Sequence, residues 1–245
     1  MKVGAVILAA GSGTRLNEGQ PSDKPKVLYQ LNGKPMIAYT LDLLDQLKID
    51  DKVMVVGYKE EMVKDYFGGK VKYASQPERK GTAHAAKLGE EVLGQDVTHL
   101  LIIQGDDSAF YKMETIQKFI DACNESKIGF TTVKLQEPGQ YGRIIRNEQA
   151  NVVAIVEKES LTEEQKKINE VNAATYFVER NWFNSVYPTL KPSAVGKGEI
   201  IMPDLIAAAA NSGKKVVGFE VTTEEWIGVN TPEELERADK LKRQG

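Results

Sequence analysis

A glycine-rich segment with nearby basic residues is the first part of this sequence whose residue types could do chemistry. It reads LAAGSGTRL over Leu8–Leu16, follows an apolar run, and precedes KPKVL at Lys24–Leu28. Glycines allow the backbone N–H groups of a turn to approach an anion closely. Arg15 offers a planar fork to phosphate oxygens and Lys26 a compact point charge, so the segment is a candidate triphosphate-binding loop. The alternative is a tight turn with two surface cations.

Two better-known nucleotide motifs do not fit this segment. Gly11 and Gly13 match the first half of the dinucleotide fingerprint, but Leu16 stands at the position of its third glycine. No Asp or Glu ends a second strand about 20 residues further on, where a ribose ligand is expected. The phosphate-loop ending Gly-Lys-Ser/Thr is absent as well, since the Gly-Lys pair at Gly33 continues into proline. A single nucleotide is therefore the favoured ligand.

A pair of acidic residues follows a second apolar run. HLLIIQ at His99–Gln104 continues into Gly105, Asp106 and Asp107. One or two carboxylates at the end of a strand, together with phosphate oxygens, are suited to hold Mg²⁺. The alternative is an ordinary Gly-Asp-Asp turn.

A third group lies in the segment ASQPERKGTAHAA. Gln76 can pair with the edge of a base, and a helix that begins at Gly81 and Thr82 is expected to offer free N–H groups. The alternative is a surface turn capped by Thr82. His84 has no nucleophile or triad partner nearby in the sequence, so we expect it to pack on its helix rather than to catalyse.

Strands that alternate with helices are expected to position these residues. Apolar runs rich in Val and Ile predict strands at Val3–Leu8, Lys52–Gly57, His99–Gln104, Ile128–Lys134, Val152–Glu157, Ala173–Glu179 and Lys215–Val221. Amphipathic patterns predict helices at Pro35–Leu47 and Met113–Ala122, a solvated helix or lid within Leu161–Asn169, and a capping box at Thr231–Glu234. This alternation predicts an α/β fold with a mainly parallel sheet covered by helices on both faces. Ligands in such folds lie beyond the carboxyl ends of the strands.

The composition limits the remaining classes. The chain of 245 residues is 41% hydrophobic and 27% charged with a net charge of −3, so no strongly basic face for nucleic acid is expected. Cys123 is the only cysteine and there are two histidines, which excludes an intrachain disulfide and disfavours a structural zinc site. The apolar N-terminal run is too short to span a membrane and lacks a cleavage pattern. We expect a single-domain cytoplasmic protein.

Taken in order, these segments resemble the sugar-1-phosphate nucleotidyltransferases, most closely the uridylyltransferase domain of the bifunctional N-acetylglucosamine-1-phosphate uridylyltransferases. The resemblance is carried by LAAGSGTRL with Pro25-Lys26, Gln76 with GTAHA, Gly105-Asp106, YGRIIR at Tyr141–Arg146, IVEK around Glu157, Val171-Asn172 and GVNTPEEL at Gly228–Leu235. Each motif is weak alone, but the ordered set is specific and spans nearly the whole chain. No hexapeptide repeat of the acetyltransferase β-helix occurs, so we expect either a stand-alone enzyme or a shortened bifunctional one, without the acetyltransferase step.

The resemblance implies a Rossmann-like, glycosyltransferase-A-like fold. It also implies a nucleotide-binding half at about residues 1–110, a sugar-binding half at about 111–230 and a C-terminal helix at about 231–243. By the resemblance, the UTP contacts are Leu8, Ala9, Ala10, Gly11, Gly13, Gln76, Gly81 and Thr82, with Arg15 and Lys26 neutralising the triphosphate. Asp106 and Asn230 would hold Mg²⁺, and Gly142, Glu157 and Asn172 would contact the sugar-1-phosphate.

The implied reaction suits these residue types. An oxygen of the sugar-1-phosphate attacks the α-phosphorus of UTP in line, and pyrophosphate leaves, with Arg15, Lys26 and Asp106 as the catalytic residues. Because the attacking phosphate is already an anion at neutral pH, no general base is required. Positioning and charge neutralisation would supply the catalysis.

Three positions depart from the family pattern. Lys24 is a second candidate for the phosphate-binding lysine. Asp107 stands where the family usually has an apolar residue, which makes it a second candidate metal ligand. The family's Asn-Thr-Gly at the sugar site reads Asn-Ala-Ala and ends at Ala174, whose methyl group bears on the choice of sugar.

We therefore expect a Mg²⁺-dependent uridylyltransferase with N-acetylglucosamine-1-phosphate as the first-choice acceptor. One alternative is thymidylyl or uridylyl transfer to glucose-1-phosphate or another phosphorylated small molecule, and a cytidylyltransferase is more distant. A nucleotide-sugar sensor that binds without turnover is the non-enzyme alternative. Neither a membrane nor nucleic acid is an expected partner, and the sequence does not predict the oligomeric state.

Overall fold

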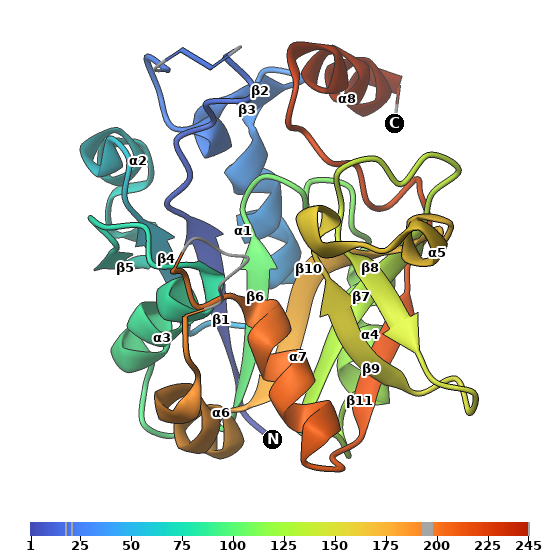
Figure 1. The fold of residues 1–245 in the computed structure, drawn as a ribbon. Coiled ribbons are helices and arrows are strands. Elements are labelled where there is room, and N and C mark those ends of the chain that lie inside the picture. The colour runs from blue at the N-terminus through green and yellow to red at the C-terminus, as the bar shows by residue number, and fades with distance from the viewer. Residues whose placement is uncertain (18, 21, 193–197, 245) are drawn as a thin grey trace.

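A nine-stranded mixed sheet forms the centre of the molecule in the computed structural model, which describes residues 1–17, 19–20, 22–192 and 198–244. Its main path runs in the order β11-β7-β10-β6-β1-β4-β5; off this path, β8 pairs with β10, and β9 pairs with β8 (Figure 1). The strands are β1 (Val3–Ala9), β4 (Lys52–Val56), β5 (Lys72–Ser75), β6 (His99–Gln104), β7 (Ile128–Lys134), β8 (Arg143–Arg146), β9 (Val152–Val156), β10 (Glu170–Glu179) and β11 (Val216–Glu220). A separate two-stranded ribbon is made of β2 (Gln30–Leu31) and β3 (Lys34–Pro35).

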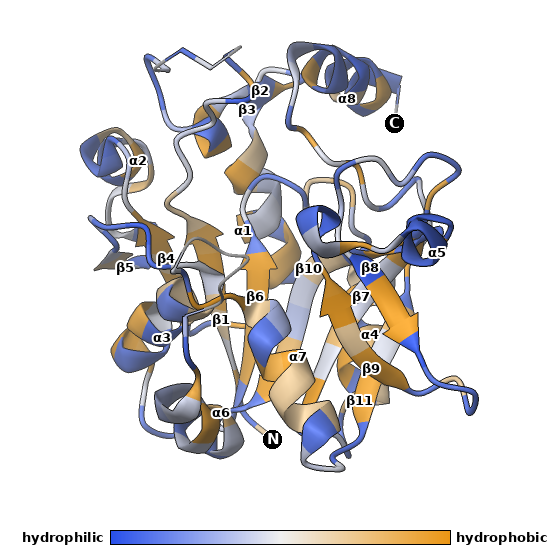
Figure 2. Ribbon diagram, viewed as in Figure 1, coloured by the Kyte–Doolittle hydropathy of each residue, from blue (hydrophilic) through white to orange (hydrophobic). Residues whose placement is uncertain are grey.

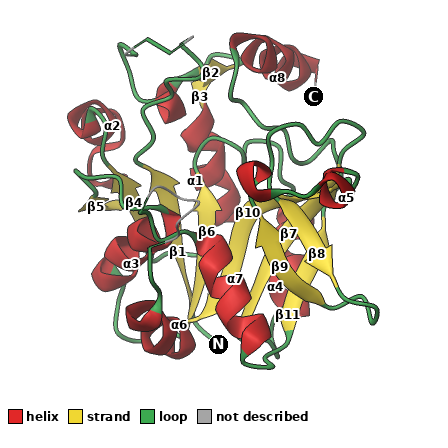
Figure 3. Cartoon of the chain, viewed as in Figure 1, coloured by secondary structure: helices red, strands yellow, loops and turns green. Residues whose placement is uncertain are grey.

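Helices cover both faces of this sheet (Figure 3). The helices of the described residues are α1 (Met36–Gln46), α2 (Glu60–Phe67), α3 (Thr82–Val92), α4 (Met113–Ala122), α5 (Glu163–Lys166), α6 (Arg180–Val186), α7 (Met202–Asn211) and α8 (Pro232–Gln244), and α8 packs on the β2–β3 ribbon instead of the sheet. No helix in the described ranges is long and apolar enough to cross a membrane.

The alternation of side chains along the strands explains the two layers of helices. In β1, Ala5 and Ile7 belong to a core that includes residues of α1, α2 and α4, whereas Val6 and Leu8 belong to the opposite core with α3, α6 and α7. Successive residues of a strand point to opposite faces, so a strand buried on both sides must be apolar throughout. Figure 2 shows β1 and the middle of β6 as apolar, while α5 and α8 are mostly hydrophilic.

The mixed pairing brings the ends of distant segments to one edge of the sheet. β1 is parallel to β4 and β6, and β4 is parallel to β5, so their carboxyl ends lie together. β10 is antiparallel to both β6 and β7, which places its first residues, around Asn172, at that same edge. The register between β10 and β7 shifts between Asn172 and Tyr176, as in a β-bulge.

The predicted fold class is confirmed, and several elements match closely. The predicted β6, β7 and α4 have the observed bounds, and the capping box of α8 is formed by Thr231 and Glu234. The sequence reasoning missed β5, β8 and the β2–β3 ribbon, each of only two to four residues, too short to show a period. β10 also begins earlier than expected, because Asn172 stays in the sheet until the bulge.

The close packing of α3 on the sheet can be tested at Gly89. A Cβ at this position would overlap the Val6 side chain and lie 3.0 Å from Val55 Cγ2. We expect Gly89→Ala to lower the free energy of unfolding by about 1–2 kcal/mol, because overpacking outweighs the better helix propensity of alanine. Urea unfolding measures this change. Gly69→Ala is the matched control, since no described heavy atom lies within 4 Å of its Cβ position; equal effects of the two changes would contradict the packing.

Candidate active site

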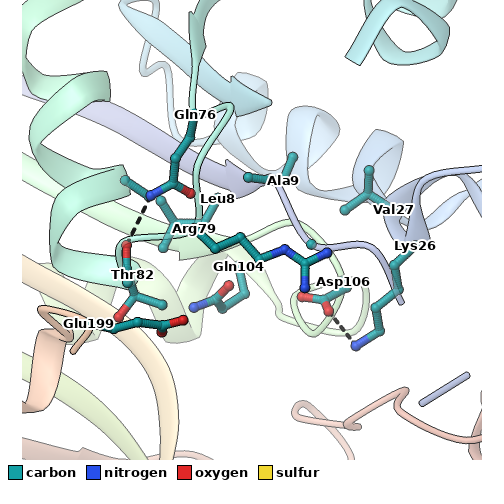
Figure 4. Close-up of a pocket in the computed structure, with 14 residues that line it drawn as sticks. Leu8, Ala9, Lys26, Val27, Gln76, Arg79, Thr82, Gln104, Asp106 and Glu199 are labelled. Atoms are coloured by element: carbon teal, nitrogen blue, oxygen red, sulfur yellow. Dashed lines mark hydrogen bonds and ion pairs between the residues drawn. The ribbon is translucent and has the colours of Figure 1, made fainter. Parts of the chain in front are cut away.

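A cavity of about 210 Å³ lies beyond the carboxyl ends of β1, β5 and β6 (Figure 4). Its walls contain nine residues predicted from the sequence: Leu8, Ala9, Ala10, Gly11, Lys26, Gln76, Gly81, Thr82 and Asp106. The remaining lining residues are Val27, Arg79, Ala85, Gln104 and Glu199. We call this space the first cavity. Three segments that are far apart in the sequence, those around Gly11, Gln76 and Asp106, thus meet at this cavity.

A larger cavity of about 580 Å³ adjoins the first one and shares residues with it, including Gly11, Lys26 and Asp106. The predicted residues that line only this second cavity are Gly13, Arg15, Gly142, Glu157, Asn172 and Asn230. All residues predicted to form the site therefore line one cavity or both. Gly13, predicted as a nucleotide contact, faces the second cavity.

A buried ammonium group lies where the two cavities meet. Lys26 Nζ forms an ion pair with the Asp106 carboxylate and donates a hydrogen bond to Asn230 Oδ1 at 3.1 Å. The side chain of Lys26 is only 10% exposed and that of Asp106 only 19%. Gly13, with φ of +68°, allows this approach, because its missing Cβ would lie 3.0 Å from Lys26 Cβ.

The charges around Lys26 keep it protonated. Burial by itself would lower its pKa, but the neighbouring carboxylates of Asp106 and Asp107 outweigh that effect, and the pKa of Lys26 is raised. Burial, together with the negative charge of Asp106, raises the pKa of Asp107 to about 7. Asp107 Oδ1 is buried and has no hydrogen-bond partner among the described residues.

The donor set of this centre fits a divalent ion such as Mg²⁺. Asp106 and Asn230 already hold a cation, the Lys26 ammonium, between a carboxylate and an amide oxygen. In the described part of the chain, no group of three or more His, Cys, Asp or Glu side chains is placed to hold a metal. An ion here would therefore need phosphate oxygens to complete its coordination, as is usual for Mg²⁺.

Asn230 is positioned by the start of α8. Its backbone N–H donates to Glu234 Oε2 at 2.6 Å, and the same carboxylate accepts from the N–H of Thr231 at 3.1 Å. The Asn230 amide nitrogen donates to the Tyr141 hydroxyl at 3.3 Å, and its oxygen also accepts from Arg15 at 3.3 Å. The predicted capping box thus also orients a predicted metal ligand.

The start of α3, in the segment that follows Gln76, has a different local structure from the expected one. Gly81 has φ of +99° and packs so tightly that a Cβ would overlap the Ile200 carbonyl. The Ile200 oxygen accepts the Ala83 N–H at 3.0 Å. The expectation of free N–H groups at the start of α3 was therefore wrong for Ala83, because a loop distant in sequence satisfies it. Thr82 does not cap the helix; its hydroxyl accepts from Met202 N–H at 2.9 Å.

Gln76 and His84 contact each other directly. The Gln76 side chain, 5% exposed, uses its amide nitrogen to contact the Gly81 carbonyl oxygen at 3.1 Å and His84 Nδ1 at 2.9 Å. His84, which we expected to pack on its helix rather than to catalyse, thus also touches a residue of the first cavity.

The three residues that the resemblance assigns to the sugar, Gly142, Glu157 and Asn172, all line the second cavity. The Glu157 carboxylate packs against Gly142, where an added Cβ would lie 3.3 Å from both carboxylate oxygens. Burial and the nearby Glu159 raise the pKa of Glu157. Asn172 accepts from the Ala174 N–H at 2.9 Å and donates to the Tyr176 hydroxyl at 2.7 Å. These contacts stabilise the bulge of β10 at the cavity wall.

Some residues of the two cavities were not predicted. Arg79 lines both cavities, and Gln104 is the last residue of β6 before the acidic pair. Both stand inside segments that the sequence had singled out, so their position next to Gln76 and Asp106 was the available signal. Glu199 stands outside those segments and carries no such signal. Lys24, the second candidate for Lys26, lines neither cavity; its ammonium lies 4.5 Å from the Tyr29 ring centre.

A family model described as nucleotidyl transferase matches residues 4–244 of this sequence. The chain belongs to the nucleotidyl transferase family. The resemblance predicted from the ordered motifs is thereby confirmed.

Curated relatives of this nucleotidyltransferase include the bifunctional protein GlmU of Exiguobacterium sibiricum, 36% identical over 242 residues, with 98% of this chain and 53% of the relative covered. GlmU of Bacillus licheniformis is 34% identical over 243 residues, with coverages of 98% and 52%. The chain spans about half the length of these relatives.

Solved structures confirm the fold of this nucleotidyltransferase. A putative glucose-1-phosphate thymidylyltransferase from Bacillus anthracis, in complex with a sucrose, superimposes with a TM-score of 0.81 at 23% identity and covers 99% of this chain and 96% of that one. The inositol-1-phosphate CTP transferase from T. maritima has a TM-score of 0.76 at 20% identity, with coverages of 100% and 96%.

The buried cation centre can be tested by removing its ammonium. We expect Lys26→Met to lower the free energy of unfolding in metal-free buffer by about 3 kcal/mol, because it leaves buried acidic groups without a partner. Lys24→Met, which removes only a contact with an aromatic ring, is the matched control and should cost less than about 1 kcal/mol. Urea unfolding at neutral pH with a chelator measures both changes. A loss no larger for Lys26 than for Lys24 would show that the buried pair does not stabilise the fold.

Proposed function

We propose that this nucleotidyltransferase transfers a uridylyl group from UTP to a sugar-1-phosphate, with N-acetylglucosamine-1-phosphate as the first-choice acceptor. The observation that supports it most is the joining of two cavities at one buried cation centre, since Lys26 and Asp106 line both. A reaction between two phosphate-bearing substrates needs positive charge at the place where they meet. The curated GlmU relatives support the choice of chemistry.

The first cavity would bind the nucleotide. Gln76 and Gly81 line it and would contact the base, while the backbone of Ala9, Ala10 and Gly11 would lie along the nucleotide. Lys26 and Arg15 would then neutralise phosphate charge on the side of the second cavity. Glycine at the start of the loop lets the backbone approach the phosphates closely.

Asp106 and Asn230 would hold Mg²⁺ in this assignment, and the Asp107 carboxylate, whose Oδ1 has no partner among the described residues, lines the same cavity. The ion, when bound, screens the negative charges of the two substrates from each other. The chain's own contribution is the orientation of both ligands, with Asn230 held by the cap of α8 and Asp106 by the end of β6.

The second cavity would bind the acceptor. Glu157, Gly142 and Asn172 would contact the sugar, and its phosphate would face Lys26 and Arg15. An oxygen of this phosphate attacks the α-phosphorus of UTP, a new P–O bond forms, and the bond to the β-phosphate breaks to release pyrophosphate. Because the attacking oxygen is already anionic, no side chain is asked to remove a proton.

The acceptor could instead be glucose-1-phosphate or another phosphorylated small molecule, with UTP or dTTP as donor. Ala174 is the reason to consider this alternative. It lines the second cavity, and its methyl group stands where the family has glycine, so it bears on which sugar fits there. The single cysteine, Cys123, is free and buried, which suits the reducing environment of a cytoplasmic enzyme.

The catalytic proposal can be tested by pyrophosphate release with Mg²⁺, UTP and a panel of sugar-1-phosphates. We expect release with N-acetylglucosamine-1-phosphate above the other acceptors, loss of release with EDTA, and a rate lowered by about two orders of magnitude or more in Asp106→Ala. Asp65→Ala, an exposed carboxylate on α2, is the control and should keep full activity. Wild-type turnover in Asp106→Ala would remove the metal assignment. No release from any acceptor, also with dTTP and CTP, would favour a sensor that binds without turnover.

Ala174 gives a second prediction about the acceptor. Its φ of +57° is a left-handed conformation, which costs a side chain about 1–2 kcal/mol. We expect Ala174→Gly to raise the free energy of unfolding by about 0.5–1 kcal/mol and to shift kcat/KM toward N-acetylglucosamine-1-phosphate relative to glucose-1-phosphate. Ala150→Gly is the matched control, since Ala150 has φ of +61° in a turn away from both cavities. It should raise stability without changing acceptor preference. An unchanged preference in both variants would show that the Ala174 methyl does not select the sugar.

A further inference from the structure

The hydrogen bonds of Gln76 leave one atom for a ligand. Its amide nitrogen is within hydrogen-bond distance of the Gly81 carbonyl oxygen, at 3.1 Å, and of His84 Nδ1, at 2.9 Å. An amide nitrogen has two hydrogens, so both are used within the protein. The carbonyl oxygen has no partner among the described residues. Figure 4 shows the amide nitrogen turned toward the start of α3 and the oxygen on the side of Leu8 and Ala9, which line the first cavity.

The Gly81 carbonyl determines which way the amide faces. A carbonyl oxygen can only accept, so the Gln76 nitrogen must be the group that contacts it. His84 Nδ1 must then accept the second hydrogen, which requires a neutral imidazole that carries its proton on Nε2. Burial, reinforced by the positive charge of Lys80, lowers the pKa of His84 and favours this neutral form.

The backbones of Gly81 and of Gln76 are each held in place by further contacts. Gly81 is pressed against the backbone of Ile200, and the Gln76 N–H donates to the Val56 carbonyl at the end of β4 at 2.7 Å. The Gln76 side chain is nearly buried, so its amide has little freedom to turn unless one of its two acceptors is lost. Without the His84 acceptor, one amide hydrogen would be left unpaired in a buried position, and the Gly81 carbonyl alone would hold the amide in this orientation, less firmly than the two acceptors together.

We infer that His84 is a positioning residue that holds the Gln76 carbonyl oxygen toward the nucleotide base, so that the cavity selects a base that presents a ring N–H at that place. This inference rests on the proposed function. Uracil and thymine carry a hydrogen on ring nitrogen N3, whereas cytosine has a lone pair there. A fixed acceptor is therefore matched by uracil or thymine and opposed by the N3 of cytosine. In this inference His84 does not act as an acid or a base in the transfer step.

Steady-state kinetics of two His84 variants test this role. In His84→Leu the side chain cannot accept, and we expect KM for UTP to rise about tenfold with little change in kcat, and the preference for UTP over CTP to fall by about tenfold. In His84→Asn the side-chain oxygen can still accept, and we expect KM and preference within about threefold of wild type. Melting temperatures of both variants, compared with wild type, show that the fold is intact.

The two variants separate positioning from packing. Equal losses in His84→Leu and His84→Asn, or unchanged UTP preference in His84→Leu, would overturn the inference. The wild type separates this outcome from failure of the proposed function. If it releases no pyrophosphate with any nucleotide, or prefers CTP, the proposed uridylyl transfer fails before any variant is compared.

Nuclear magnetic resonance supplies a readout that does not depend on activity. Long-range ¹H–¹⁵N correlation at neutral pH should show His84 with Nδ1 unprotonated and its proton on Nε2. Its Nδ1 resonance should move in Gln76→Ala, which removes the donor, and addition of UMP should move the Gln76 side-chain amide signals of the wild type. Two results would contradict the hydrogen bond on which the inference depends: a proton on His84 Nδ1, or a Nδ1 chemical shift that is the same in wild type and in Gln76→Ala.

Discussion

The buried Lys26 ammonium is the constraint on which the rest of this structure depends. A cation can be taken out of water only if anionic or amide oxygens replace its hydration shell, and here they come from Asp106 and Asn230. These three residues stand on segments that are far apart in the sequence. The end of β6, the loop after β1 and the start of α8 must therefore meet at one point, and the two cavities open on either side of it.

The direction of β10 determines what the second side of this centre looks like. A fully parallel sheet would send the beginning of every strand to the opposite edge, away from the ligands. Because β10 runs antiparallel to β6, its first residues and its bulge lie beside the carboxyl ends of β6 and β1. One wall of the second cavity is therefore made by residues near Asn172, and its shape depends on how the bulge is stabilised by the contacts of Asn172 and Ala174.

Much of this arrangement could be predicted because local patterns carry it. The apolar run of β6 ended at the observed residue, and Asp106 follows two residues later, so both its strand and its place at the sheet edge could be predicted from the sequence. The contacts that were missed all join residues that belong to different elements. No local signal indicates that Ile200 accepts the Ala83 N–H, that His84 accepts from Gln76, or that Glu199 reaches the first cavity. The short strands β5 and β8 exist because longer neighbours offer them pairing partners, which periodicity does not report.

The route of the last segment has a consequence for the order of events during synthesis. α8 lies beside β2 (Figure 1), and Asp239 of α8 accepts the Asn32 N–H at 2.7 Å. A growing chain that has left the ribosome only through β11 already contains Lys26, Asp106 and every strand of the sheet, yet lacks Asn230 and the carboxylate that orients it. The main body can therefore collapse while the Lys26–Asp106 pair still lacks Asn230. The complete centre would form only when α8 settles on the N-terminal ribbon.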